Sequence, residues 1–179
     1  MLLSMVIVFT GNGKGKTTAV LGQMIRVVGQ DRNAIMFQFI KGPWISGEDK
    51  FLKKFPTLKG RFEIVKGGKG FVGIWGDKLP FEVHKKAAEK TLELAKKAIR
   101  SSAWDLVVLD EVNVAVSLKL IGAKNVLDAL DGLPMHKFVI LTGRNAPKSF
   151  IGRADLATEM REIKHPYEMG ELALKGVEF

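Results

Sequence analysis

The sequence predicts an α/β fold of three layers, in which helices cover both faces of a mostly parallel sheet. Apolar runs of strand length alternate along the chain with segments whose apolar residues recur at helical spacing. With 179 residues the chain can bury a sizeable core. No repeat, low-complexity linker or shift in composition divides the sequence, so we expect residues 1–179 to form a single domain.

Three strands and one helix are predicted before residue 66. Residues 5–9 are an apolar run that ends in a glycine-rich turn, which is typical of a short buried strand. Residues 17–28 are expected to form a helix, because one helical face collects Val20, Leu21, Met24, Val27 and Val28. Residues 34–40 and 61–65 are expected to be the second and third strands.

The rest of the chain is expected to contain two helices and three strands. A long helix is predicted over residues 80–99, because Pro80 stands in its first turn and Ala and Leu follow at helical spacing. Strands at 106–109 and 138–141 flank a helix around residues 126–130. A last strand is predicted at 157–163, followed by a tail from Lys164. Residues 67–76 hold too many glycines for a regular element, so a mobile loop is expected there.

The first strand is joined to the first helix by a glycine-rich turn, Thr10-Gly11-Asn12-Gly13-Lys14-Gly15-Lys16-Thr17-Thr18. In this context main-chain N–H groups converge on phosphate, and glycines leave room for an anion to approach. Lys16 can reach the phosphates, and the Thr17 hydroxyl can hold Mg²⁺. The match to G-x-x-x-x-G-K-[ST] is imperfect, because Thr10 stands where the leading glycine belongs. We therefore predict a P-loop NTPase-like (RecA-like) fold that binds a nucleoside triphosphate; a lysine-rich surface loop is the alternative.

Two carboxylates follow the strand predicted at 106–109. Ligands of open α/β sheets lie at the carboxyl ends of the strands, so Asp110 or Glu111 could hold the Mg²⁺ bound by Thr17, as in a Walker-B motif. A helix cap is the alternative role for Asp110. Arg144 follows the strand at 138–141 and is expected at the same edge, where it could pair with phosphate or with a ligand carboxylate. The alternative for Arg144 is an ordinary surface position.

The composition narrows the class of protein. A formal net charge of +9 favours anionic partners, although a lysine-rich solvated surface would give the same charge. Without cysteine there is no disulfide framework and no thiolate metal site. The apolar runs are too short to span a membrane and no leader precedes the first strand, so a cytoplasmic protein is expected.

Two other functions are compatible with the nucleotide motifs alone. A RecA-like ATPase would act on nucleic acid, and a nucleotide-sensing module would bind without catalysis. The sequence shows no alternation of aromatic and basic residues suited to stacking bases, so nucleic acid is not expected as a partner.

Further motifs, taken together with the glycine loop, give the sequence a specific resemblance. They are FTGNGKGKTT at 9–18, QFIKG at 38–42, LDE at 109–111, LTGRNAP at 141–147, ADLATEM at 154–160, KHPY at 164–167 and KGVEF at 175–179. In combination and order they are similar to the P-loop class of ATP:corrinoid adenosyltransferases, the enzymes of adenosylcobalamin synthesis and salvage. The resemblance extends from Val6 to Phe179.

The resemblance implies a homodimer that transfers the 5′-deoxyadenosyl group of ATP to a Co(I) corrinoid and releases triphosphate. It implies a triphosphate cradle made of Gly11, Asn12, Gly13, Lys14, Gly15, Lys16, Thr17 and Thr18. It further implies that Thr17 and Glu111 hold Mg²⁺ and that Arg26 is a phosphate-side residue. In this family the phosphates run opposite to the usual P-loop direction, which leaves C5′ exposed to attack.

Co(I) is itself a strong nucleophile, so the resemblance requires none from the protein. The difficult step is reduction of Co(II), which is easier once a lower axial ligand is removed. Family members wall off that face of the corrin with aromatic side chains, and Phe71 matches one such position. Trp75 falls two residues beyond the usual second position, and ordinary packing is the alternative for both side chains.

The histidines and lysines are expected to play mainly structural or surface roles. His84, His136 and His165 are widely separated, with no pair at the spacing of metal ligands. The solvent-exposed face of the long helix is expected to carry Lys85, Lys86, Lys90, Lys96 and Lys97, interleaved with Glu82, Glu89 and Glu93. This positive surface could also dock an acidic flavoprotein reductant.

Overall fold

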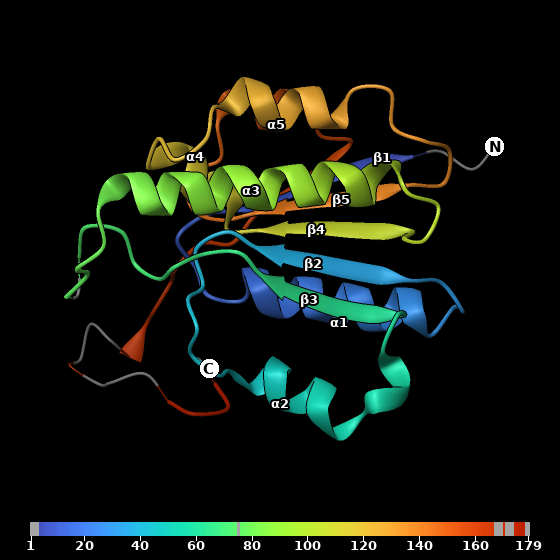
Figure 1. Ribbon diagram of the computed structural model, residues 1–179, viewed down its shortest axis with the longest axis horizontal. Coiled ribbons are helices and arrows are strands. Elements are labelled where there is room, and N and C mark those ends of the chain that lie inside the picture. Colours follow the sequence, from blue (N-terminus) through green and yellow to red (C-terminus); the bar gives the residue numbers. More distant parts are fainter. Residues whose placement is uncertain (1–3, 75, 167–169, 171–173, 178–179) are drawn as a thin grey trace.

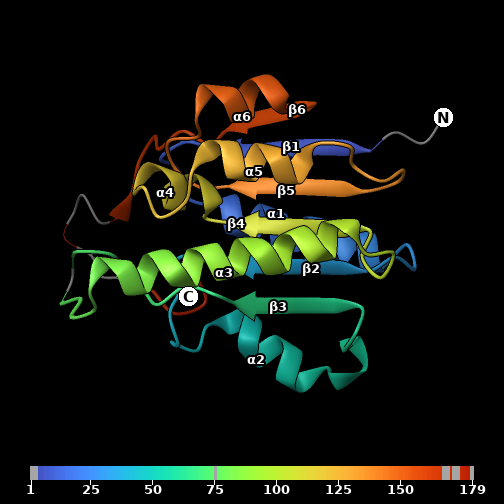
Figure 2. The same cartoon turned by 45° about the horizontal axis from the view of Figure 1, so that its top comes forward.

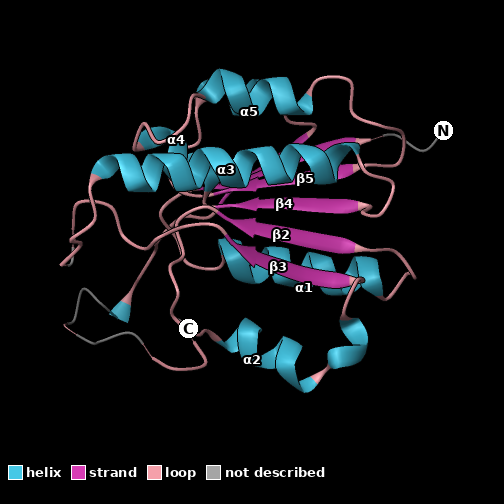
Figure 3. Ribbon diagram, viewed as in Figure 1, coloured by secondary structure: helices cyan, strands magenta, loops and turns pink. Residues whose placement is uncertain are grey.

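The computed structural model describes residues 4–74, 76–166, 170 and 174–177, and a single six-stranded sheet lies at its centre (Figure 1). The strand order is β3-β2-β4-β5-β1-β6, and all neighbouring strands pair in parallel. The strands are β1 Met5–Thr10, β2 Ala34–Gln38, β3 Phe62–Lys66, β4 Leu106–Asp110, β5 Phe138–Thr142 and β6 Leu156–Glu159. Their carboxyl ends therefore all meet at one edge of the sheet (Figure 3).

Helices cover both faces of the sheet, which confirms the predicted three layers. Figure 2 shows α3 and α5 in front of the strands and α1 behind them. The helices are α1 Lys16–Val28, α2 Gly47–Lys54, α3 Phe81–Arg100, α4 Val112–Ser117, α5 Ala123–Leu130 and α6 Lys148–Arg153, with a 3₁₀ turn at Pro56–Leu58. Among the described residues no helix is both long and apolar enough to cross a membrane.

The core consists of two apolar clusters, one on each face of the sheet. Alternate residues of a strand point to opposite faces, so Met36 packs toward α1 whereas Phe37 packs toward α3. Both faces are covered, and β2, β4 and most of β5 are accordingly buried along their length. This packing fixes the strands from both sides and so holds their carboxyl ends in place.

All strands and helices predicted from the sequence are present, but two strands end earlier than expected. The strand predicted at 34–40 ends at Gln38, whose carbonyl is shared by the N–H groups of Gly67 and Gly68, each at 3.0 Å. The strand predicted at 157–163 covers Leu156–Glu159. It ends there because the Met160 carbonyl turns to accept the Gly13 N–H at 2.7 Å.

Three helices were not predicted from the sequence. Helix α2 begins with a capping box, in which the Asp49 carboxylate accepts the Ser46 N–H at 2.7 Å. That signal was available in the sequence. Helices α4 and α6 have six residues each, which is too short for a helical period to be recognised.

Candidate active site

The glycine-rich turn lies at the carboxyl edge of the sheet, between β1 and α1. Gly15 caps the N-terminus of α1 with a φ of +113°, a left-handed conformation that glycine adopts without strain. Within the described part of the chain no side chain caps this helix end, so the N–H groups of its first turn can bind an anion. The geometry agrees with a loop that binds phosphate.

The loop is fixed by the chain that follows β6. A Cβ atom on Gly11 would lie 2.3 Å from the Met160 carbonyl oxygen, and one on Gly13 would lie 2.7 Å from that of Arg161. These glycines therefore allow a close main-chain approach. Thr10, which replaces the usual leading glycine, accepts the Ala146 N–H on Oγ1 at 3.2 Å. Its side chain thus ties the loop to the segment after β5.

Lys16 lies inside the loop and is buried. Its Nζ donates to the carbonyl oxygens of Gly11, at 2.8 Å, and Gly13, at 2.6 Å. Burial lowers the pKa of Lys16, while the negative charge of Glu111 opposes that shift. A cation is therefore held at the centre of the loop.

Asp110 ends β4 and joins the loop to the carboxyl ends of two strands. Its Oδ1 accepts the hydroxyl groups of Thr17, at 3.0 Å, and Thr142, at 2.8 Å. Its Oδ2 accepts a longer bond, 3.4 Å, from the Gln38 amide. Burial raises the pKa of Asp110, and these donors act in the opposite direction. Its position at the carboxyl end of β4, beside the loop, is the one predicted, and the N-cap position of the following helix is occupied by Glu111.

Glu111 stands beside Asp110 in an unusual main-chain conformation. Its φ is +61°, and its N–H donates to Thr142 Oγ1 at 2.9 Å. Burial and the neighbouring charge of Asp110 raise the pKa of Glu111 to about 7, whereas Lys16, Arg144 and Lys41 lower it. A left-handed residue fixed by a hydrogen bond, with a carboxyl group whose pKa is raised, is typical of a positioned functional carboxylate.

The other predicted residues fall into two groups. Asn12, Lys14 and Thr18 are exposed on the loop and first turn of α1. Arg144 is also exposed, and its charge acts on both Lys16 and Glu111. Arg26, by contrast, is exposed in the last turn of α1, about 15 Å along the helix from Lys16 at 1.5 Å per residue. The structure does not bring Arg26 to this cluster.

Three further residues belong to the cluster but were not assigned to it from the sequence. They are Gln38, Lys41 and Thr142. Lys41 follows β2, pairs with Glu48 of α2, and lowers the pKa values of both Asp110 and Glu111. Lys41 lies there because β2 pairs with β4. The order of strands in a sheet cannot be inferred directly from the sequence.

The cluster has the chemistry of a Mg²⁺ site. Thr17 Oγ1 donates its proton to Asp110, which leaves its lone pairs for a cation. A bound cation would also compensate the buried negative charge of Asp110. The described residues contain no group of three or more His, Cys, Asp or Glu side chains that could cage a metal alone. Mg²⁺ commonly takes only one or two protein ligands beside phosphate and water, so this donor set fits it.

The loop after β3 carries Phe71 and is anchored to α3. The described part of residues 67–76 contains no helix or strand, as predicted, and Trp75 lies outside the described residues. Asp77 accepts the N–H groups of Gly73, at 2.8 Å, and Leu79, at 3.0 Å. These bonds lower the pKa of Asp77. The Nε2 atom of the buried His84 lies 3.0 Å from Asp77 Oδ2. His84 is therefore structural, and His136 is exposed, as expected.

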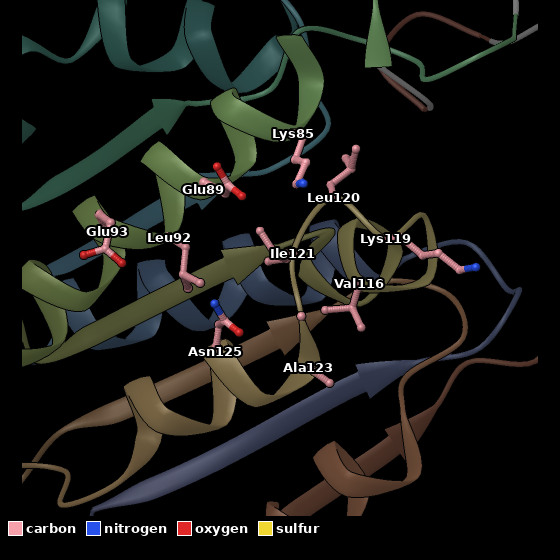
Figure 4. A pocket seen from close by; sticks show the side chains of 11 residues that line it. Lys85, Glu89, Leu92, Glu93, Val116, Lys119, Leu120, Ile121, Ala123 and Asn125 are labelled. Atoms are coloured by element: carbon pink, nitrogen blue, oxygen red, sulfur yellow. The ribbon is translucent and has the colours of Figure 1, made fainter. Parts of the chain in front are cut away.

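A cavity of about 520 Å³ lies apart from this cluster, between α3 and the connection of α4 to α5 (Figure 4). Leu92, Leu120 and Ile121 line it together with Glu89, Glu93 and Lys119. None of the residues predicted for nucleotide or metal binding borders it. This cavity is therefore separate from the predicted nucleotide site at the carboxyl edge of the sheet.

Comparisons with known proteins agree over nearly the full chain. Residues 3–179 match the family described as ATP:corrinoid adenosyltransferase BtuR/CobO/CobP. The corrinoid adenosyltransferase CobA of Salmonella typhimurium is 33% identical over 174 residues, which cover 97% of this chain and 85% of that protein. A corrinoid adenosyltransferase of Sinorhizobium is 38% identical over 176 residues, which cover 98% and 80% of the two chains.

Proposed function

This chain belongs to the ATP:corrinoid adenosyltransferase family, and on that premise we propose that its carboxyl-edge cluster holds ATP for attack by a corrinoid. The reaction transfers the 5′-deoxyadenosyl group of ATP to the cobalt of a Co(I) corrinoid. The observation that carries the proposal is the bond from Thr17 to Asp110, because it joins the phosphate loop to a buried carboxylate. Thr142 in turn links Asp110 to the main chain of Glu111.

The chemical step requires that the triphosphate leaving group is bound and that its negative charge is neutralised. The Co(I) electron pair forms the bond to C5′, the C5′–O bond breaks, and its electrons leave with triphosphate. Cobalt ends as an alkylated Co(III). Lys16 and Lys14 stabilise the negative charge that develops on the leaving oxygen, together with the N–H groups at the start of α1.

The cluster would hold Mg²⁺ through Thr17 and Glu111, while Asp110 accepts a hydrogen bond from the Thr17 hydroxyl group. When bound, Mg²⁺ adds charge stabilisation at the phosphate oxygens. Lys41 and Arg144 add two cations, and both lower the pKa of Glu111. Because Glu111 keeps its proton up to about pH 7 in this environment, metal binding requires it to lose that proton.

The direction of the nucleotide distinguishes this function from ATP hydrolysis. We propose that the phosphates run opposite to the usual P-loop direction, so that C5′ and not the γ-phosphorus faces the open edge. Phe71 then walls off the lower face of the corrin, where loss of an axial ligand eases the reduction of Co(II). Its loop leaves the sheet at the same edge as the glycine turn, which supports this assignment (Figure 1).

The partners follow from the same premise. A homodimer is proposed from the family resemblance, a cytoplasmic location from the sequence, and an acidic flavoprotein reductant from the positive surface of the long helix. The net charge of +9 and the exposed Lys86, Lys90 and Lys97 of α3 support docking of an acidic protein. Arg26 remains a prediction for phosphate binding, without support from its position.

Product analysis tests the function. The protein is incubated with Mg-ATP and a reduced corrinoid, and the products are separated. Triphosphate and an adenosylated corrinoid are expected. ADP and phosphate, formed faster with DNA or RNA, would instead indicate a nucleic-acid-dependent ATPase. Unchanged ATP would indicate a nucleotide-sensing module.

A further inference from the structure

Two segments leave neighbouring strands and run side by side at the carboxyl edge of the sheet. Residues 39–44 follow β2, and residues 67–71 follow β3. The Gly70 N–H donates to the Ile40 carbonyl at 2.9 Å. A Cβ atom on Gly68 would lie 2.3 Å from the Ile40 carbonyl carbon, so only glycine allows this approach. The two segments are therefore held as one unit.

The indole of Trp44 packs over this unit. A Cβ atom on Gly70 would lie 2.7 Å from the Trp44 ring, and one on Gly42 would lie 3.0 Å from it. The Trp44 and Phe71 ring centroids are 5.8 Å apart, with an angle of 36° between the planes. Lys66 also donates to the Trp44 carbonyl oxygen, which fixes the main chain below the ring.

Both rings remain open to solvent in spite of these contacts. Trp44 is 60% exposed and Phe71 is 48% exposed, and the neighbouring Ile45 and Ile74 are also exposed. A tryptophan that served only to pack the loop would gain more by burial. An exposed aromatic pair among apolar neighbours, at the edge where ligands of such sheets bind, is typical of a binding surface for a flat, largely apolar ligand.

We propose that Trp44 is a second aromatic residue that contacts the corrin ring, and that it also positions Phe71 for the same contact. This inference rests on the proposed function. It assigns to Trp44, which follows β2, the place of a second aromatic residue beside Phe71, a position that Trp75 misses by two residues in the sequence. A planar macrocycle can lie across both rings at once, whereas the triphosphate lies at the cluster of Lys16 and Asp110.

Steady-state kinetics of three variants test the proposal. Trp44→Ala is expected to raise the KM for cob(I)alamin about tenfold and to leave the KM for ATP within about twofold of wild type. Trp44→Phe keeps a ring and should recover most of the loss. Trp104→Phe is the matched control, because Trp104 precedes β4 at the opposite edge of the sheet, and it should behave as wild type.

A binding measurement provides a second readout besides turnover. In the variant Trp75→Phe/Trp104→Phe, Trp44 is the remaining tryptophan, and hydroxocobalamin is expected to quench its fluorescence strongly at saturation. The variant Trp44→Phe/Trp75→Phe, which keeps Trp104, should show weaker quenching.

Three results would overturn the proposal. They are an unchanged corrinoid KM in Trp44→Ala, an equal rise in the KM values for corrinoid and ATP, and equal quenching in the two single-tryptophan variants. Failure of the proposed function is distinguishable from these, because wild-type protein would then form no adenosylated corrinoid at all.

Discussion

Lys16 is a side chain on which we expect transfer to depend strongly. Its ammonium group spans the glycine loop through the carbonyl groups of Gly11 and Gly13, where the triphosphate charge must be balanced. Lys16→Ala is expected to lower kcat by at least about a hundredfold, the usual loss when a positioned donor to a developing anion is removed. The formation rate of adenosylated corrinoid measures this.

Lys59→Ala is the matched control, because Lys59 is exposed and precedes β3 at the opposite edge of the sheet. It should retain wild-type turnover. Circular dichroism should show both variants folded. Near-normal turnover of a folded Lys16→Ala variant would show that the glycine loop does not hold the leaving group.

Glu111 makes the stability of the ligand-free protein depend on pH. Its pKa is about 7 in the folded chain against an ordinary value of 4.5. Between these values the folded state binds more protons than the unfolded state, so the free energy of unfolding falls as pH rises from about 4.5 to about 7. The shift corresponds to a loss of the order of 3 kcal/mol.

Urea unfolding of the wild type and of Glu111→Gln across this pH range measures the effect. The difference in unfolding free energy between the two proteins should change steadily with pH, because the amide that replaces the carboxyl group in the variant cannot ionise. A difference that stays constant from about pH 4.5 to about pH 8 would contradict the raised pKa of Glu111.

Sequence and structure agree on the part of the site that short motifs encode. The loop residues, Asp110 and Glu111 are contiguous in sequence with their strands, so their place at the edge was predictable. Lys41 and Thr142 reach the cluster only because β2 and β5 both neighbour β4. The packing of Trp44 on Gly70, which makes Trp44 a candidate corrin contact, cannot be inferred from the sequence.

Among the structural elements, the loop after β3 is anchored toward α3 by Asp77. Asp77 accepts the amides of Gly73 and Leu79 and contacts His84 of α3. Asp77→Ala is expected to speed amide hydrogen exchange in residues 70–80 about tenfold. The reason is that the N–H groups of Gly73 and Leu79 lose their acceptor. Mass spectrometry of the exchanged peptides measures this.

Asp128→Ala is the matched control for that experiment. Asp128 pairs with Lys124 on an exposed face of α5, so its loss should leave the loop unchanged. Equal exchange in residues 70–80 of the wild type and Asp77→Ala would show that the loop is held by other contacts.

Helices and strands were predictable where the helical or strand spacing of apolar residues continues over enough positions. Helix α3 has 20 residues, and the buried strands are continuous apolar runs. Strand ends were less predictable. The carbonyl of Met160, just after β6, turns to accept the Gly13 N–H, and the Gln38 carbonyl at the end of β2 is shared by Gly67 and Gly68. Such long-range bonds leave no local pattern in the sequence.

The distribution of charge over the molecule predicts a salt effect on electron delivery. If an acidic flavoprotein docks on the positive surface, screening should weaken the encounter, because the Debye length falls from about 10 Å at 0.1 M to about 3 Å at 1 M salt. Raising the salt concentration over this range should slow flavoprotein-driven adenosylation about tenfold and leave the chemically reduced reaction unchanged. Equal slowing of the two reactions would refute electrostatic docking.

The direction of the bound nucleotide decides between adenosyl transfer and phosphate chemistry at this edge. A crystal structure of the complex with Mg-ATP measures it. We expect the triphosphate on the glycine loop, with the ribose C5′ turned toward the exposed rings of Trp44 and Phe71. A γ-phosphorus that faces those rings, with the ribose turned away from them, would contradict the proposed function.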